Sequence, residues 1–238
     1  MLHIGRCGQV LFVCKHHFSQ KMANLLHDLN VNTKKATLAM GCFWGPDSLY
    51  GATKGVVRTR VGYSGGEKPC PTYRSIGDHT ESIDIDYNPD EISYSELLNL
   101  FWANHDPTLK TKPQYTSLIF YHDNEQKQIA EESLKEQERL KEGVVTRIIP
   151  FKEFYNAEDY HQKYRLQQYP QLMEAIGITK GSTLLIDSHL AARLNGYVVG
   201  FGGVNQFNEE VGKFGLDEKT IEDIRDLVIK YEGMGLTC

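Results

Sequence analysis

Cys42 occupies a position in the sequence that suits a reactive thiol. It follows the apolar run 37–40, which predicts a buried strand, and it precedes Pro46 and Asp47, residues typical of the first turn of a helix. The unpaired amides and the dipole at a helix start favour negative charge, so a cysteine at this elbow is predicted to be held as the nucleophilic thiolate. The alternative is an inert buried thiol, the commoner situation for a cysteine in a globular protein.

Two large aromatic side chains, Phe43 and Trp44, come directly after the cysteine. Together they could wall an apolar pocket for a small hydrophobic group. The alternative is that both belong to the ordinary core. Gly41 and Gly45 permit sharp turns on either side of the thiol, and this combination favours a functional site.

Glu81 is the candidate acid. The segment 81–87 alternates in polarity, so as a strand it places Glu81 on the same face as Ile83 and Ile85. A carboxyl group desolvated among apolar side chains has a raised pKa and can donate a proton near neutrality, as a general acid must. The alternative is a carboxylate at the rim of the sheet, in water.

His79 lies close to this acid in the sequence, and a metal site could be imagined from His79, Glu81 and the more distant His105. No pair among His79, Glu81 and His105 has the spacing of metal ligands on a helix. We therefore expect no metal, and we expect His79 to lie behind the site or at the surface.

Predicted strands and helices alternate around these residues. Apolar periodicity predicts strands over 37–40, 56–63, 81–87, 117–121 and 144–149. It predicts helices over 93–104, with Ser93 as the cap, and over 123–141, 157–168, 183–194 and 217–231. The pattern indicates an α+β catalytic core over 34–154, followed by a helical extension over 155–238.

Composition restricts the kinds of partner. The chain has 238 residues and a formal net charge of −5, which argues against a nucleic-acid partner held by electrostatics. No run is long and apolar enough to span a membrane, so we expect no membrane partner. Five irregularly spaced cysteines do not form the framework of a secreted disulfide protein, and we therefore expect a reducing compartment, the cytoplasm.

Residues 1–33 differ from the rest of the chain, because they contain a single acidic residue, Asp28, among scattered basic residues. This composition is loosely that of a mitochondrial targeting leader, although Arg6 is the only arginine. The alternative is a loosely docked N-terminal arm. Met22 could serve as an internal start that bypasses the segment.

Several short motifs follow one another along the chain. The motifs are Gly41-Cys42-Phe43-Trp44-Gly45, Gly62-Tyr63-Ser64-Gly65-Gly66, Pro71-Thr72-Tyr73-Arg74, His79-Thr80-Glu81, Phe101-Trp102, His105-Asp106-Pro107-Thr108 and Gln114-Tyr115. In this order they resemble the peptide methionine sulfoxide reductase A family. The resemblance covers residues 35–154. The helical C-terminal part is similar to a divergent, animal-type branch of the same family.

This resemblance implies a role for each candidate residue. Cys42 is the nucleophile that attacks the sulfur of methionine sulfoxide, and Glu81 is the acid that protonates the sulfoxide oxygen. Phe43 and Trp44 enclose the substrate methyl group, and a tyrosine pair binds the oxygen. That pair consists of Tyr73 and Tyr115.

The resemblance also implies the fold, the substrates and the partner. The fold is a mixed-sheet, two-layer α+β sandwich, and the reaction reduces the S epimer of methionine sulfoxide, in proteins and free, without a cofactor. The reductant is thioredoxin, and a monomer is expected. The aspartate-containing segment of the family is shortened here to residues 109–113, so substrate preference is expected to differ.

A second thiol is needed to regenerate Cys42, because a sulfenic acid condenses with a neighbouring cysteine to give a disulfide that thioredoxin can open. Cys238 is the predicted resolving cysteine, since it ends a flexible segment, Gly233 to Gly235, and the family often carries resolving cysteines in its C-terminal tail. Cys70, on a loop near Tyr73, is the competitor.

Two other classes of function remain open. One is a peroxidase-like thiol enzyme, although a peroxide needs no aromatic methyl cage. The other is a non-catalytic protein that binds oxidised methionine. Retention of Cys42, Glu81 and Tyr73 together argues against loss of activity.

Overall fold

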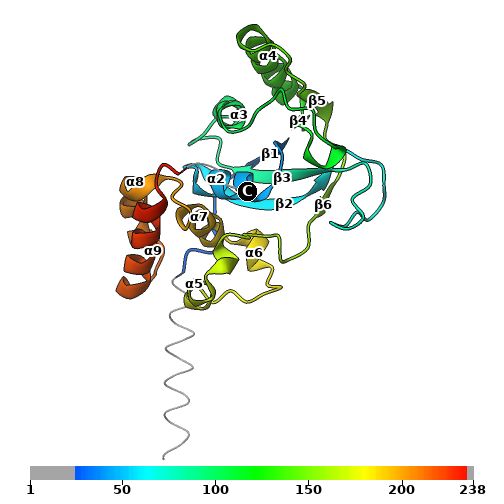
Figure 1. Ribbon diagram of the computed structural model, residues 1–238. Coiled ribbons are helices and arrows are strands. Elements are labelled where there is room, and N and C mark those ends of the chain that lie inside the picture. Colours follow the sequence, from blue (N-terminus) through cyan, green and yellow to red (C-terminus); the bar gives the residue numbers. More distant parts are fainter. Residues whose placement is uncertain (1–24, 235–238) are drawn as a thin grey trace, which may run out of the picture.

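The core of the protein is one mixed sheet of six strands in the order β5-β4-β1-β3-β2-β6 (Figure 1). The structure is a computed structural model that describes residues 25–234. Its strands are β1 (Lys34–Ala39), β2 (Val56–Ser64), β3 (Thr80–Tyr87), β4 (Leu118–Tyr121), β5 (Arg147–Pro150) and β6 (Phe154–Asn156). All neighbours are antiparallel except β4 and β5, which run parallel. The five strands predicted from the sequence are present, whereas β6 was not predicted.

The central strand β3 is buried on both faces. Glu81, Ile83 and Ile85 are at most 2% exposed, as predicted. The opposite face also lacks contact with water, because Ser82 is fully buried and Asp84 is 2% exposed. The Asp84 carboxylate is held by several side chains on the two neighbouring strands, and this network replaces the solvent expected from the alternating pattern.

Three helices pack with the sheet in the first apolar core. They are α2 (Trp44–Ala52), α3 (Tyr94–Ala103) and α4 (Asn124–Leu140). Ser93 caps α3 as predicted, since its hydroxyl accepts from the Glu96 amide and the Glu96 carboxylate accepts from the Ser93 amide. The Tyr50 hydroxyl of α2 donates to the Leu97 carbonyl of α3, so both helices contribute to one apolar core over the sheet.

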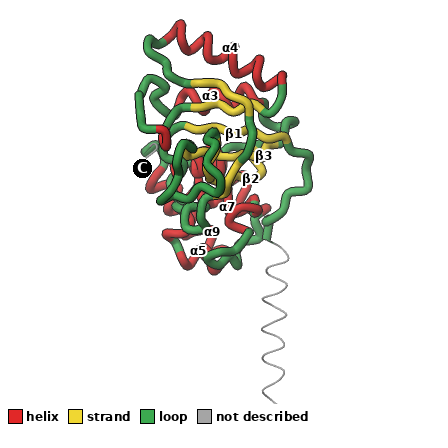
Figure 2. Tube along the Cα trace, turned by 90° about the vertical axis from the view of Figure 1, so that its right-hand side faces the viewer, coloured by secondary structure: helices red, strands yellow, loops and turns green. Residues whose placement is uncertain are grey.

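The C-terminal helices form a second apolar core, and Figure 2 shows these helices on the opposite side of the strands from α3 and α4. These helices are α5 (Pro170–Ala175), α6 (Leu184–Asp187), α7 (His189–Tyr197), α8 (Gly203–Glu210) and α9 (Glu218–Tyr231), with 3₁₀ turns at η2 (Leu166–Gln168) and η3 (Val211–Lys213). A further 3₁₀ turn, η1 (Pro113–Tyr115), lies earlier in the chain, between α3 and β4. The predicted helix 183–194 is broken at Ser188, whose hydroxyl instead caps α7 by accepting from the Ala191 amide at 3.0 Å.

Helix α7 joins the two cores by packing closely against α2. A Cβ added to Gly196 would lie 2.4 Å from the Ala52 Cβ, and one added to Gly51 would lie 2.3 Å from the Ala192 carbonyl oxygen. Glycine at both positions therefore allows the two helices to approach backbone to backbone. This contact anchors the helical extension directly behind the helix that follows Cys42.

The prediction of a helix over 157–168 was wrong. The segment consists of turns followed by the 3₁₀ turn η2, because its polar groups bond to the sheet and not along a helix axis. The Gln162 side chain donates to the Val61 carbonyl at 2.8 Å and accepts from the Val61 amide at 3.0 Å. Lys163 has a φ of +50°, which a continuous right-handed helix excludes.

The α+β fold class predicted from the sequence, a mixed-sheet sandwich with a helical C-terminal extension, is confirmed. Over residues 25–234, none of the helices is both long and apolar enough to cross a membrane.

Candidate active site

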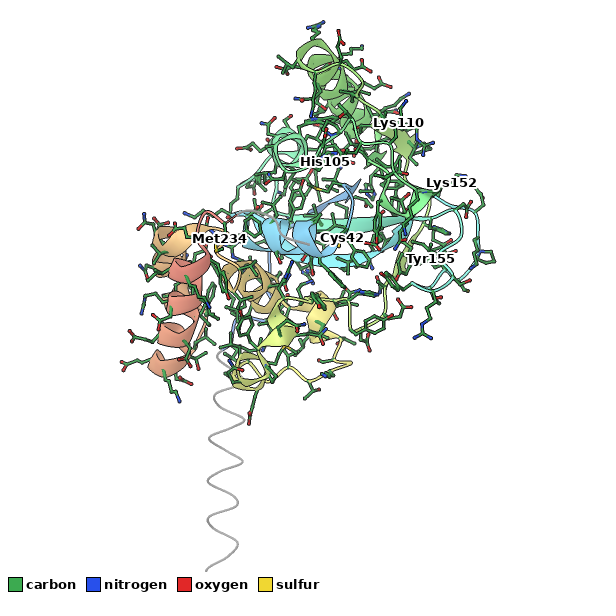
Figure 3. The ribbon with its side chains drawn as sticks, in the orientation of Figure 1. Cys42, His105, Lys110, Lys152, Tyr155 and Met234 are labelled. Carbon is green, nitrogen blue, oxygen red and sulfur yellow. The ribbon has the colours of Figure 1, made fainter. Side chains whose placement is uncertain are left out.

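Cys42 lies at the predicted elbow between β1 and α2. Gly41 has a φ of +93°, in the region that favours glycine, and it turns the chain so that Cys42 and Phe43 directly precede the first helical residue, Trp44. The Cys42 side chain is partly exposed and is not in a disulfide. Figure 3 shows Cys42 at the N-terminal end of α2, beside the sheet. Asp47 lies in the first turn of the helix, as predicted.

Glu81 is directly linked to the residue after the thiol. Its Oε2 accepts the Phe43 amide at 3.1 Å, and its Oε1 accepts the Gln114 side-chain amide at 2.7 Å. The side chain is buried, and burial raises the pKa of its carboxyl above the ordinary value, although the two hydrogen bonds oppose this by stabilising the carboxylate. The prediction of a desolvated acid is therefore confirmed.

The two tyrosines lie beside this acid and the thiol. Burial raises the pKa of Tyr115 to about 12, and the negative charges of Glu81, Tyr73 and Cys42, together with a hydrogen bond to Tyr73, act in the same direction. Tyr73 itself is 39% exposed, and its backbone amide donates to the Glu158 Oε1 at 3.0 Å. Tyr115 thus remains a neutral hydrogen-bond donor near neutral pH.

Phe43 and Trp44 form the walls of an aromatic cage that has further members. The Trp44 ring stacks on Tyr164 with centroids 3.8 Å apart and an interplanar angle of 8°. His161 closes the cage, with ring centroids 5.1 Å from Phe43 and 4.7 Å from Tyr73. The side chains around Phe43 and Trp44 are therefore mainly aromatic, a chemistry that suits contact with a small apolar group.

The protonation of His161 follows from its contact with Trp44. The indole nitrogen can only donate, and it lies 3.2 Å from His161 Nδ1, so this ring nitrogen is the acceptor and Nε2 carries the proton. Burial lowers the pKa of His161, which keeps the ring neutral near neutral pH. The Nε2 atom is buried without a hydrogen-bond partner among the described residues.

The remaining sequence candidates lie outside this cluster. His79 is 1% exposed and bridges the Gly66 amide and the Lys68 carbonyl, so it fastens the loop between β2 and β3 and does not lie at the surface. His105 lies beside α3, away from Cys42 in Figure 3. Over residues 25–234, no group of three or more His, Cys, Asp and Glu side chains could hold a metal ion.

Of the two candidate resolving cysteines, the described residues include only Cys70. Cys70 is exposed on the loop between β2 and β3. The pKa of nearby Tyr155 is raised mainly by its hydrogen bond to Glu153, with a smaller contribution from the Cys70 charge. Cys238 lies outside the described residues, as do Cys7 and Cys14.

Sequence reasoning missed three functional neighbours of the site: Gln114, Glu158 and His161. Gln114 was noted only as part of a motif, yet it donates to the acid. Glu158 accepts from the Tyr63 hydroxyl at 2.8 Å and from the Tyr73 amide, and so positions the Tyr73 loop. A helix was predicted where Glu158 and His161 lie, and no spacing within that segment indicates a site. Their roles depend on contacts made across the fold.

A partly exposed thiol, a buried carboxyl with a raised pKa, two phenols and a group of aromatic side chains define the class of protein. It is a cysteine-dependent oxidoreductase whose substrate carries an oxygen to be protonated next to a small apolar group. A peroxidase does not account for the cage.

Comparison with known proteins identifies the family. Residues 34–193 match the family model "Peptide methionine sulfoxide reductase", and residues 183–229 match "Selenoprotein methionine sulfoxide reductase A, helical domain". The peptide methionine sulfoxide reductase of Drosophila melanogaster is 51% identical over 225 residues, covering 92% of this chain and 91% of that protein. MsrA of Methanosarcina acetivorans is 42% identical over 163 residues, covering 63% and 87%.

Solved structures agree with the sequence comparison. Reduced Mxr1 from Saccharomyces cerevisiae superposes with a TM-score of 0.54 at 32% identity, covering 62% of this chain and 91% of that chain. Methionine sulfoxide reductase A of Corynebacterium diphtheriae gives a TM-score of 0.52 at 33% identity, covering 58% and 76%. The chain belongs to the peptide methionine sulfoxide reductase family, and its activity is the reduction of methionine S-sulfoxide to methionine.

Proposed function

We propose that Cys42 attacks the sulfur of methionine S-sulfoxide while Glu81 protonates the sulfoxide oxygen. The observation that carries this assignment is the 3.1 Å hydrogen bond from the Phe43 amide to Glu81, which ties the acid to the residue beside the nucleophile. The sulfoxide oxygen is a poor leaving group until it is protonated, and a buried carboxyl whose pKa is raised by burial is suited to supply that proton.

The other residues of the cluster have supporting roles. Tyr73 and Tyr115 donate hydrogen bonds from their hydroxyl groups to the oxygen as its charge develops, and the raised pKa of Tyr115 keeps that phenol a donor. Phe43 and Trp44 hold the methyl group, and the asymmetry of a cage on one side and donors on the other selects one sulfoxide epimer. Gln114 orients the acid.

The atoms and electrons of the step balance as follows. The Cys42 thiolate attacks the substrate sulfur and forms a sulfur–sulfur bond, while Glu81 gives its proton to the oxygen. The hydroxyl group then moves to the Cys42 sulfur as the sulfur–oxygen and sulfur–sulfur bonds break, and the electron pair of the sulfur–sulfur bond stays with the substrate sulfur. The thioether leaves as methionine and Cys42 becomes a sulfenic acid. A second thiol then condenses with the sulfenic acid, releasing water and forming a disulfide.

The proposed second thiol is Cys238, and the proposed reductant is thioredoxin, whose two thiols reduce the disulfide by exchange. Support for Cys238 comes from its place in the sequence after Gly233 and Gly235, two glycines that give the chain a wide range of conformations. Substrates are proposed to be both protein-bound and free methionine sulfoxide.

The test is a single turnover of reduced enzyme without any reductant. The enzyme is mixed with either epimer of N-acetyl methionine sulfoxide, and methionine formed and sulfenic acid trapped are counted per enzyme. We expect about one equivalent from the S epimer alone, none from Cys42→Ser, and a wild-type yield from Cys70→Ser as the matched control. Methionine formation by the Cys42→Ser variant would overturn the assignment.

A further inference from the structure

Lys112 lies at the rim of the active site, in the short segment that leads to Tyr115. Its ammonium group is 4.9 Å from the centroid of the Tyr115 ring, and the side chain is exposed. The charge of Lys112 is also felt by Glu81, where it opposes the rise in pKa caused by burial. A positive charge therefore faces solvent beside the phenol and the carboxyl assigned to the substrate oxygen.

The backbone that carries Lys112 is fixed on both sides. The Tyr115 amide donates to the Lys112 carbonyl at 3.0 Å, which starts the turn η1. The Thr80 hydroxyl donates to the Pro113 carbonyl at 2.8 Å, and so ties the turn to the start of β3. Although the lysine side chain is exposed, its attachment point is held at a constant position relative to the pocket.

The Tyr73 side of the site carries charges of both signs. Glu158 keeps its negative charge there, since its two partners, the Tyr63 hydroxyl and the Tyr73 amide, are uncharged donors. Arg74, next to Tyr73, is exposed and adds positive charge on that side. The protein as a whole has a formal charge of −5, so a cationic rim here is opposite in sign to its average surface.

We propose that Lys112 selects methionine sulfoxide flanked by acidic residues, or followed by a free carboxylate, over methionine sulfoxide flanked by lysine. A carboxylate next to the oxidised methionine would reach the ammonium group at the rim, whereas a neighbouring lysine would be repelled. This inference rests on the proposed roles of Tyr115 and Glu81, since these roles place the substrate beside Lys112.

The experiment compares capped pentapeptides Gly-Xaa-Met(S-sulfoxide)-Xaa-Gly in which Xaa is Asp, Ser or Lys, with dithiothreitol as reductant. For the wild type at low ionic strength, we expect kcat/KM for the Asp peptide to exceed that for the Lys peptide by roughly two- to tenfold. The ratio should approach one in about 1 M KCl, where the screening length is about 3 Å.

Charge reversal identifies the responsible residue. Lys112→Glu should invert the ratio, and Lys112→Gln should bring it near one. The matched control is Lys110→Glu, two residues earlier, which makes the same change in net charge at a side chain that Figure 3 shows away from Cys42. The control should keep the wild-type ratio.

Each result has a distinct meaning. The neutral Ser peptide tests the reaction itself, and a failure of the wild type to reduce it would contradict the proposed function. If the Ser peptide is reduced but the wild-type ratio is one, or if Lys110→Glu and Lys112→Glu change the ratio equally, the inference about Lys112 is wrong. Since the readout is a ratio between peptides, a general loss of activity in a variant cancels.

Discussion

Asp47 and Lys163 form an ion pair that is closed off from water. Lys163 Nζ lies 3.0 Å from Asp47 Oδ1, and the two side chains are 0% and 1% exposed. The Lys163 amide donates to Asp47 Oδ2 at 3.0 Å, and the Thr59 hydroxyl donates to Oδ1 at 2.6 Å. The pair fixes the first turn of α2, beside Cys42, to the segment that contains His161 and Tyr164, whose rings pack on Phe43 and Trp44.

Breaking this pair on one side should destabilise the protein strongly. Asp47→Asn or Lys163→Met leaves an uncompensated buried group, so we expect each to lower the free energy of unfolding by about 3–5 kcal/mol. Urea unfolding followed by far-UV circular dichroism measures the change. The matched control is Lys152→Met, which breaks an ion pair with Glu67 whose side chains are 70% and 80% exposed, and should change the free energy of unfolding far less. Equal losses in the two cases would contradict the role of burial.

Glu81→Gln should slow the first turnover by roughly 10²–10⁴, because the amide cannot protonate the sulfoxide oxygen. The wild-type rate should fall as the pH rises through the raised pKa of Glu81, and this fall should be absent in the variant. Rapid-quench measurement of methionine formed gives both results. A loss under about tenfold would assign the proton to another group.

Glu81 also links stability to pH. Its folded-state pKa is raised, so the wild type is most stable, relative to Glu81→Gln, while the carboxyl is protonated in both states. As the pH rises from the ordinary value of 4.5 through the raised pKa, the unfolded state ionises first and the wild type loses stability. In urea unfolding of both proteins across this window, the free energy of unfolding of the wild type minus that of Glu81→Gln should fall as the pH rises; a rise would contradict the raised pKa.

Gln114→Met tests the hydrogen bond at the other oxygen of the acid. The 2.7 Å bond from Gln114 stabilises the carboxylate, so its removal should raise the pKa of Glu81 further. The fall in single-turnover rate should therefore move to higher pH in the variant. A shift to lower pH, measured over the same buffers, would show that Gln114 favours the protonated acid instead.

Trp44→Ala should remove one wall of the cage and the donor to His161. We expect kcat/KM for methionine sulfoxide to fall by roughly 10²-fold, in keeping with about 3 kcal/mol for a lost aromatic contact. The rate at which iodoacetamide alkylates Cys42 should change little, since that reaction needs no cage. Parallel losses in both assays would indicate that the site has collapsed.

Cys238→Ser should spare the first turnover and block thioredoxin-driven cycling, while dithiothreitol restores much of the activity by reaching the sulfenic acid directly. Cys70→Ser should affect neither assay. Peptide mass mapping of the oxidised enzyme locates the disulfide. A bridge between Cys42 and Cys70 would transfer the resolving role to the exposed loop.

The parts of the site that the sequence predicted are those set by local chemistry. The turn at Gly41, a helix that starts after Cys42 with Asp47 in its first turn, and the burial of Glu81 on the face of Ile83 and Ile85 depend on a few neighbouring residues, and these were confirmed. The fold class followed for the same reason, because most strands and helices have a clear apolar period.

The parts that could not be predicted depend on contacts between distant segments. Gln162 looked helical by composition, yet bonds to the backbone of β2 hold it in a turn. Asp47 looked like a simple complement to the helix dipole, but Lys163 is its partner across 116 positions of the chain. Neither His161 nor Glu158 shows, in its own surroundings in the sequence, which pocket it completes.

The late position of the cage in the chain has a consequence for biosynthesis. Cys42 leaves the ribosome before Glu81, and well before His161 and Tyr164, which close the cage over Trp44. At 5–20 residues per second the interval before the cage can form is on the order of 10 s. Throughout that time the thiol is in reach of oxidants with neither its acid nor its cover in place. An enzyme that repairs oxidised protein is thus most open to oxidative damage while it is itself being made.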